Sequence, residues 1–236
     1  HLHGMQGVGG SSPPSSTTSS VKSWWYRDGR PFVRDGEGAS VCTARTDGPR
    51  MNTAVTSERH TGRDGRPWTL RPARPTDAGP LARLFAAVRA EGRWLVTPAS
   101  AISEPSEAYF LGELIVGEST LALVAEADGE VVGNVLVSVE RSTISDHIGT
   151  LSICILDGWR DIGMGGVLVR AALDWARERG LVKVALGVFP DNERAIAVYE
   201  RAGFVREGLR RQQYRSGGTY RDEVLMAWFP SRSDAS

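Results

Sequence analysis

The most informative segment of this chain is Arg160-Asp161-Ile162-Gly163-Met164-Gly165-Gly166. An apolar, strand-like segment over residues 151–156 precedes it, and a helical run over residues 167–179 follows it. A strand that feeds a glycine-rich turn and then a helix brings several backbone N–H groups and the positive end of the helix dipole to one point. The stretch therefore predicts an anion site, most often a site for phosphate.

Two common phosphate-binding motifs fit this turn poorly. A P-loop requires a Lys-Ser/Thr pair after its last glycine, but Gly166 is followed by Val167 and Leu168. A dinucleotide fingerprint requires a third glycine where Leu168 stands, and an acidic residue about 20 residues after the turn, near Leu186. A tight turn without a ligand is the alternative that these residues leave open.

Composition limits the class of protein. The chain has 236 residues, of which 41% are hydrophobic, and 28 basic residues balance 28 acidic ones. This is enough for one sizeable core, and it lacks the basic footprint of a nucleic-acid binder. The two cysteines, Cys42 and Cys154, lie far apart and indicate neither a disulfide framework nor a metal site, so we expect a reducing, cytoplasmic location. No apolar run is long enough to span a membrane, and the N-terminus does not have the pattern of a secretory signal.

The chain divides into three regions. Residues 1–66 are predicted to be a disordered, low-complexity extension, because Gly, Ser, Thr and Pro dominate residues 9–20. Residues 67–230 are predicted to form one folded domain, and residues 231–236 a short tail. We further expect the natural protein to start near Met51, with no function in residues 1–50.

Periodicity within the folded domain predicts a mixed α+β sheet. Strands are expected at residues 68–73, 120–127, 130–140, 151–156, 181–189, 204–209 and 223–229. Helices are expected after the cap at Thr76-Asp77 and at residues 106–116, 167–179 and 192–202. The dipeptide Asp128-Gly129 is a strong hairpin signal between two of the strands, and Gly203 is typical of a helix C-cap.

A second pattern lies in the helix that starts after the strand at residues 181–189. Asn192, Ile196 and Tyr199 stand at i, i+4 and i+7, so they share one helix face. An amide and a phenol therefore point the same way. The plainer interpretations are that Asn192 satisfies its own backbone at the helix start and that Tyr199 is a core residue.

Together these two segments resemble the GNAT superfamily of acyl-CoA N-acyltransferases. Arg160, Gly163 and Gly165 match its Arg/Gln-x-x-Gly-x-Gly/Ala pyrophosphate loop. After this loop the family carries an Asn and then an Ala-x-x-x-Tyr-type helix that ends in Gly-Phe. This chain matches that pattern with Asn192, Ala195, Tyr199, Gly203 and Phe204. The segment 217–226 resembles the terminal hairpin of many bacterial members, so the resemblance covers residues 68–230. The chain departs from the family at Asp161, where many members have glycine.

The resemblance implies a central mixed, mostly antiparallel sheet with helices on both faces, and acetyl-CoA (coenzyme A) as co-substrate without a metal. It implies that the pyrophosphate rests on N–H groups of the turn and that the strand before the turn supplies an oxyanion donor at Ile155 or Leu156. It also makes Tyr199 the general acid for the leaving thiolate. The cofactor-binding residues implied in this way are Ile155, Leu156, Arg160, Ile162, Gly163, Met164, Gly165, Gly166, Val167, Asn192 and Tyr199.

The general base is less determined by the sequence. Glu140 is the first candidate, because it ends a central strand where bases of this family often lie. The other groups able to accept the amine proton are Glu126, Asp157 and His147. Trp94, Tyr109 and Phe110 lie in the helical stretch that covers the acceptor site in this fold, and either pocket shape or plain packing explains them.

The function that the resemblance implies is transfer of an acetyl group from acetyl-CoA to a primary amine of a small molecule, by direct attack in a ternary complex. The alternatives are a protein N-terminal or lysine acetyltransferase, and a non-catalytic CoA-sensing module. The expected partner is thus a small-molecule amine rather than a nucleic acid or a membrane, and homodimer formation is left open.

Overall fold

A computed structural model describes residues 56–95, 104–117, 119–139, 144–216 and 218–230, all within one compact unit, Arg45–Ser236. Its strands are β1 (Glu58–Thr61), β2 (Pro67–Pro72), β3 (Thr120–Ala127), β4 (Glu130–Val139), β5 (Ile148–Ile155), β6 (Lys183–Val188), β7 (Val205–Ser216) and β8 (Thr219–Trp228). Its helices are the short 3-10 helix Pro75–Asp77, α1 (Ala78–Ala90), α2 (Glu104–Val116), α3 (Met164–Glu178) and α4 (Glu193–Arg201).

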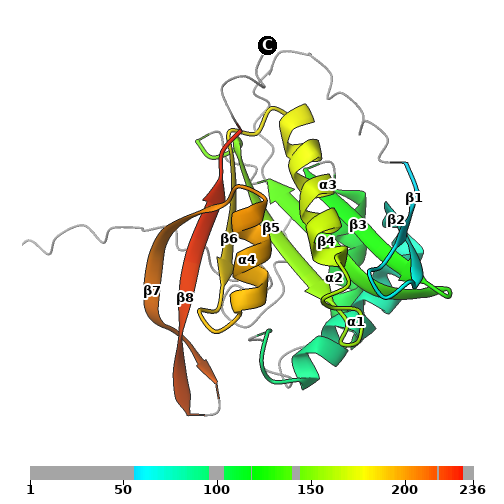
Figure 1. The fold of residues 1–236 in the computed structure, drawn as a ribbon, viewed down its shortest axis with the longest axis horizontal. Coiled ribbons are helices and arrows are strands. Elements are labelled where there is room, and N and C mark those ends of the chain that lie inside the picture. The colour runs from blue at the N-terminus through cyan, green and yellow to red at the C-terminus, as the bar shows by residue number, and fades with distance from the viewer. Residues whose placement is uncertain (1–55, 96–103, 118, 140–143, 217, 231–236) are drawn as a thin grey trace, which may run out of the picture. The chain divides into compact units, whose positions relative to one another are not determined.

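The eight strands form one sheet in the order β1-β2-β3-β4-β5-β6-β8-β7. Every neighbouring pair is antiparallel except β5 and β6, which run parallel because α3 carries the chain across the sheet between them. Helices α3 and α4 cover one face and α1 and α2 the other, as Figure 1 shows. The predicted mixed, mostly antiparallel α+β architecture is therefore confirmed.

The main core lies between α3 and the sheet. The apolar side of α3 is buried over alternate residues of the central strands, with Leu168, Val169 and Ala172 fully enclosed. Every second side chain of a strand points to the same face of the sheet, so the apolar side chains of β3 to β5 that share a face meet α3. The core fixes the start of α3 against the end of β5, and these two elements flank the predicted anion site.

The turn between β3 and β4 is the hairpin that the sequence predicts. Asp128 and Gly129 have φ values of 51° and 81°, and Ala127 pairs with Glu130 on either side of them. Two consecutive left-handed residues match the right-handed twist of the flanking strands. A short polar residue and a glycine are the residue types that adopt this backbone most readily.

The predicted start of the folded domain is too late. Residues 58–61 form β1, which pairs with β2 through the register Glu58↔Leu70 to Thr61↔Pro67, so the prediction of disorder up to residue 66 is wrong for this segment. Glu58-Arg59-His60-Thr61 shows no apolar alternation, because the strand lies at the sheet edge and is mostly exposed. Residues 1–55 and Glu140 lie outside the described residues, so the predictions about them stay predictions.

None of the helices in the described part of the chain has the length and apolar content needed to cross a bilayer. Among those same residues, no group of three or more His, Cys, Asp or Glu is placed to hold a metal ion.

The parallel pairing of β5 and β6 is short. Its register runs only from Ile148↔Lys183 to Thr150↔Ala185, although β5 continues to Ile155 and β6 to Val188. Beyond Ala185, β6 pairs with β8 alone. The sheet is thus split between its central strands at the end where the glycine turn lies.

Gly149 lies in the short segment where β5 and β6 are still paired, opposite Val184. A Cβ at Gly149 would lie 2.8 Å from Val137 Cγ1 and 2.9 Å from Leu181 Cδ1, and both of those side chains are buried. We expect Gly149→Ala to lower the free energy of unfolding by about 1–3 kcal/mol, because the added methyl overpacks a closed core. Chemical denaturation measures this change.

Gly208→Ala is the matched control, since Gly208 also lies in a strand but has nothing within 4 Å of the corresponding position. Equal stability of the two variants would contradict the close approach at Gly149.

Candidate active site

The glycine turn presents a row of backbone N–H groups. Gly163 is the N-cap of α3 and has a left-handed φ of 96°, which favours glycine. By helix geometry the N–H groups of Gly163 to Gly166 have no partner within the helix, whereas Val167 is the first residue whose N–H bonds back to the cap. We call these four groups the predicted anion-binding row; the N–H of Val167, which was also predicted to contribute, bonds within the helix.

Apolar side chains hold this turn on the sheet. Ile162 and Met164 are 8% and 1% exposed and belong to the core beneath α3, so only their backbone groups can face a ligand. A Cβ at Gly165 would lie 3.6 Å from Ile155 Cδ1 and 3.9 Å from Val198 Cγ1. The turn thus sits between the end of β5 and α4.

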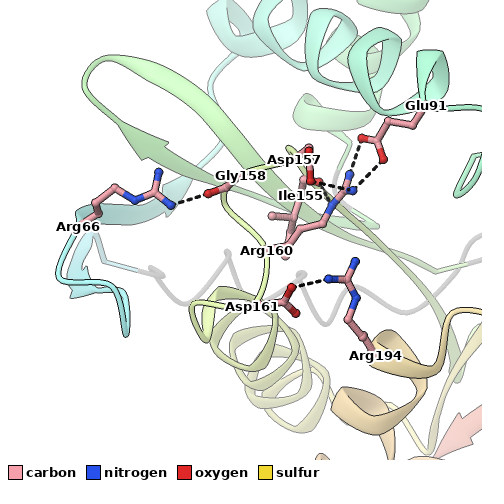
Figure 2. A network of polar contacts seen from close by, with 8 residues as sticks. All are labelled: Arg66, Glu91, Ile155, Asp157, Gly158, Arg160, Asp161 and Arg194. Carbon is pink, nitrogen blue, oxygen red and sulfur yellow. Dashed lines mark hydrogen bonds and ion pairs between the residues drawn. The ribbon is translucent and has the colours of Figure 1, made fainter.

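Arg160 holds the turn together. Its Nε donates to the carbonyl oxygen of Ile155 at 2.9 Å, and its two Nη atoms donate to both carboxylate oxygens of Glu91 at 2.6 and 2.7 Å (Figure 2). Asp157 lies 3.6 Å away on the same guanidinium. This residue was predicted to bind the cofactor, but the contacts that it makes in the structure join the end of β5 to the end of α1.

Asp161 stands in the turn at a position where glycine was expected. Its φ is 64°, which explains why a glycine suits this place, and aspartate is among the few other residues that tolerate such a backbone. Its carboxylate is paired with Arg194 of α4, as Figure 2 shows. The negative charge is thereby neutralised beside the anion-binding row.

The two predicted oxyanion donors differ in the structure. The N–H of Leu156 donates to the carbonyl oxygen of Val132 at 2.9 Å, so Leu156 already has a backbone partner on β4. Because backbone groups alternate in direction along a strand, the N–H of Ile155 points away from β4, toward the side where β6 has separated. Ile155 therefore has the geometry expected of the donor, and Leu156 does not.

Helix α4 carries Asn192 at its start and Tyr199 near its end. Asn192 is the N-cap, and its side-chain oxygen accepts from the N–H of Ala195 at 3.3 Å, as its plainer interpretation predicts. Gly203 ends the helix with a φ of 94°, its N–H bonding to Glu200 and the N–H of Phe204 to Tyr199, each at 3.0 Å. This is a Schellman motif, and it confirms the predicted C-cap.

Tyr199 packs against the core and against Phe204, with the two ring centroids 5.7 Å apart. Burial raises the pKa of the phenol to about 12, so the hydroxyl stays protonated at neutral pH. Its hydroxyl makes no hydrogen bond to any residue that the structure describes. Tyr199 therefore holds a proton, and none of the described residues accepts a hydrogen bond from it.

The other proposed bases lie in different surroundings. Arg71 donates to Glu126 at 2.6 Å in a buried ion cluster that also contains Asp77. Asp157 is mostly exposed beside Arg160, and His147 is exposed beside Asp146. None of these three is placed at the split between β5 and β6 with a free proton-accepting group, and Glu140 lies outside the described residues.

The three aromatic residues expected near the acceptor lie in different environments in the structure. Trp94 lines a cleft of about 300 Å³ together with Arg93 and residues 191–194 at the start of α4, so it lies close to Asn192. Tyr109 is 70% exposed on α2 and does not pack in the core. Phe110 is half-buried on the same helix.

Two polar features near the site were missed by the sequence analysis. The turn between β1 and β2 contacts the glycine turn, with the N–H of Arg63 bonded to Ile162 at 3.0 Å. On the sheet face opposite α3, Glu223 is 7% exposed and accepts from Tyr214 at 2.8 Å and from Arg210 at 3.1 Å. The first feature depends on contact between distant segments and the second on the register of the β7–β8 hairpin, so neither is marked by a sequence motif.

Comparison with known proteins identifies similar chains. The model of the Acetyltransferase (GNAT) family matches residues 90–204. An L-amino acid N-acetyltransferase of Escherichia coli is 30% identical over 130 residues, which are 53% of this chain and 78% of that protein. A [ribosomal protein bS18]-alanine N-acetyltransferase of Salmonella typhimurium is 30% identical over 52% of this chain and 78% of its own length. A spermidine N(1)-acetyltransferase of Escherichia coli is 28% identical over 58% of this chain and 72% of its own length.

Solved structures share the fold. A GNAT-family acetyltransferase from Streptococcus pneumoniae has a TM-score of 0.63 and 26% identity, covering 69% of this chain and 99% of its own. A putative acetyltransferase from Salmonella typhimurium, solved with its cofactor acetyl-CoA, has a TM-score of 0.61 and 18% identity over 70% of this chain and 95% of its own.

The left-handed backbone at Gly163 gives a direct test of the anion-binding row. We expect Gly163→Val to abolish binding of acetyl-CoA, the ligand expected at this turn, because a β-branched residue cannot adopt a φ of 96° without moving the N–H groups. Calorimetric titration measures the loss.

Gly180→Val is the control, because Gly180 has a φ of 73° at the opposite end of α3 and imposes a similar strain far from the turn. Tight binding by the Gly163 variant, or equal loss in both variants, would refute this assignment.

Proposed function

This chain belongs to the acetyltransferase (GNAT) family, and we propose on that basis that it transfers the acetyl group of acetyl-CoA to a primary amine of a small molecule by direct attack in a ternary complex. Acetyl-CoA-dependent N-acetylation is the activity of the family. What we propose for this chain is that the acceptor is a small-molecule amine and that the residues named below have the roles given there. The observation that carries it is the position of the four N–H groups of Gly163 to Gly166 beside the split between β5 and β6.

The pyrophosphate of CoA would rest on these four N–H groups. A helix N-terminus favours negative charge through its dipole and through its unpaired donors. Gly166 leaves open space around the position of a Cβ, so a phosphate can approach the backbone there. The amide nitrogen of Asn192 is available as a further donor, because its capping bond uses only the side-chain oxygen.

The split in the sheet offers a path for the pantetheine arm. The arm would enter between β5 and β6 and bring the thioester carbonyl to the N–H of Ile155. That N–H would stabilise the oxyanion that forms when the amine attacks. The Arg160 bond to the Ile155 carbonyl holds the end of the strand in place during this step.

Proton transfer completes the reaction. The amine nitrogen forms a bond to the carbonyl carbon, the carbon–sulfur bond breaks, and the departing sulfur takes the proton of the Tyr199 hydroxyl. The attacking amine loses one proton to a base, for which Glu140 remains our proposal. Tyr199 also argues against a CoA-sensing module, because a module that only binds CoA has no need of a proton donor there.

The acceptor would lie on the sheet face opposite α3. Gly187 belongs to that face, because its neighbours Leu186 and Val188 point into the core under α3. The carboxylate of Glu223 lies directly against Gly187, where a Cβ would overlap it. This carboxylate already accepts from Arg210 and Tyr214, so the ammonium group of an acceptor would share its negative charge with Arg210.

A small amine is favoured over a protein acceptor. The buried position of Glu223 suits a compact acceptor more than an extended chain. The related enzymes are named for different acceptors, including amino acids, spermidine and a ribosomal protein alanine. A thiol-release assay with acetyl-CoA and a panel of small amines tests the choice, and activity with peptides alone would favour the protein alternative.

The role of Tyr199 can be tested by removing one oxygen. We expect Tyr199→Phe to lower turnover by roughly 10²–10⁴-fold while CoA affinity stays near wild type, because only the proton donor is lost. The fold should persist, since the hydroxyl makes no hydrogen bond to the described residues. Thiol release under saturating substrate measures turnover.

Tyr220→Phe serves as its control, because Tyr220 is 59% exposed on β8. Unchanged turnover in the Tyr199 variant would remove this residue from the mechanism.

The role of Glu223 predicts a different kinetic pattern. We expect Glu223→Gln to raise the KM for the amine roughly tenfold and to leave the KM for acetyl-CoA unchanged, because an amide cannot compensate the ammonium charge. Steady-state kinetics with each substrate varied in turn separates the two constants.

Glu207→Gln is the comparison variant, since Glu207 forms an ion pair with Lys183 in the same sheet. An equal effect of the two substitutions, or a change confined to acetyl-CoA, would exclude Glu223 from acceptor binding.

A further inference from the structure

We propose that Arg63, from the turn between β1 and β2, binds the pyrophosphate of CoA beside the start of α3. This inference rests on the proposed CoA site, and it adds a residue that lies outside the stretch matched by the family model, 90–204. It would make the N-terminal hairpin part of the cofactor site.

The hairpin is held against the glycine turn by three neighbouring contacts. The N–H of Arg63 donates to the carbonyl oxygen of Ile162 at 3.0 Å. The guanidinium of Arg66 lies 4.0 Å from the ring centroid of Trp159. It also donates to the carbonyl oxygen of Gly158, as Figure 2 shows. The backbone at position 63 is therefore fixed relative to the anion-binding row.

The Arg63 side chain then lies at the start of the helix. Its Nε is 3.9 Å from the position that a Cβ on Gly163 would occupy. Gly163 is the N-cap of α3, so the guanidinium stands at the positive end of the helix dipole. A cation and a helix N-terminus repel one another unless an anion lies between them, and this arrangement therefore points to a bound anion.

The neighbouring arginines are already neutralised. Arg66 pairs with Asp64, Arg160 pairs with Glu91, and Arg194 pairs with Asp161. Arg63 is exposed and has no acidic partner among the residues that the structure describes. Its charge is thus available to a ligand, whereas binding by the other three would require an ion pair to break.

A phosphate is the anion that fits this combination. Guanidinium groups bind phosphate oxygens through paired N–H donors, and the adjoining backbone N–H groups supply the remaining bonds. CoA carries a pyrophosphate and a separate 3′-phosphate. The position of Arg63 at the N-cap itself assigns it to the pyrophosphate.

The test compares two cofactors and two arginine variants. Calorimetry of the full chain should show that Arg63→Gln weakens CoA and dephospho-CoA by the same factor, roughly tenfold, because both ligands keep the pyrophosphate. Arg59→Gln removes the same charge from an exposed position on the same hairpin and should bind both ligands as tightly as wild type. The Arg63–Ile162 bond uses the backbone, so the substitution leaves hairpin docking intact.

Each other outcome overturns a stated part of the proposal. Equal affinities of the Arg63 and Arg59 variants, with tight binding by wild type, would reject the inference and leave the proposed function standing. A loss seen with CoA but not with dephospho-CoA would move the contact to the 3′-phosphate. Failure of wild type to bind CoA would reject the proposed function itself.

Loss of folded structure is tested separately. Arg63→Lys keeps the charge, and it should recover most of the affinity that Arg63→Gln loses, with an unchanged melting temperature for both variants. A lysine variant as weak as the glutamine variant would reject a charge contact.

Discussion

The pairing between β5 and β6 ends early, and the geometry of the candidate site follows from this. Two parallel strands that separate after Thr150 and Ala185 leave backbone groups without ladder partners, and such groups must be satisfied in another way. Arg160 donates to the carbonyl of Ile155, and the N–H of the same residue has no ladder partner in the described part of β4 or β6. The start of α3 follows the end of β5, and Glu223 lies against Gly187 of β6, so the opening in the sheet brings together groups of the proposed site.

Much of this arrangement could be predicted from the sequence, because its signals are local. The Asp128-Gly129 turn, the C-cap at Gly203 and the order of the elements after residue 67 all follow from residue types whose backbone preferences are strong. The left-handed backbone of Gly163 is of the same kind. Local chemistry dictates these features, and the tertiary structure agrees with it.

The features that the sequence did not reveal depend on contacts between distant residues. Strand β1 has no apolar pattern and exists because β2 pairs with it. Leu156 and Ile155 are adjacent and equally apolar, and only the register with β4 decides which N–H is free. The Arg160 side chain likewise turns toward Glu91, 69 residues away, a partner that no motif indicates.

The docking of the β1–β2 hairpin on the glycine turn has a consequence for how the protein folds. The contact between Arg66 and Gly158 joins residues 92 positions apart, and closing so long a loop slows the formation of a contact. The turn itself can form early from neighbouring residues, but its support arrives only when the far N-terminal strand has joined the sheet. Competence to hold the cofactor should thus be among the last properties that a refolding chain acquires.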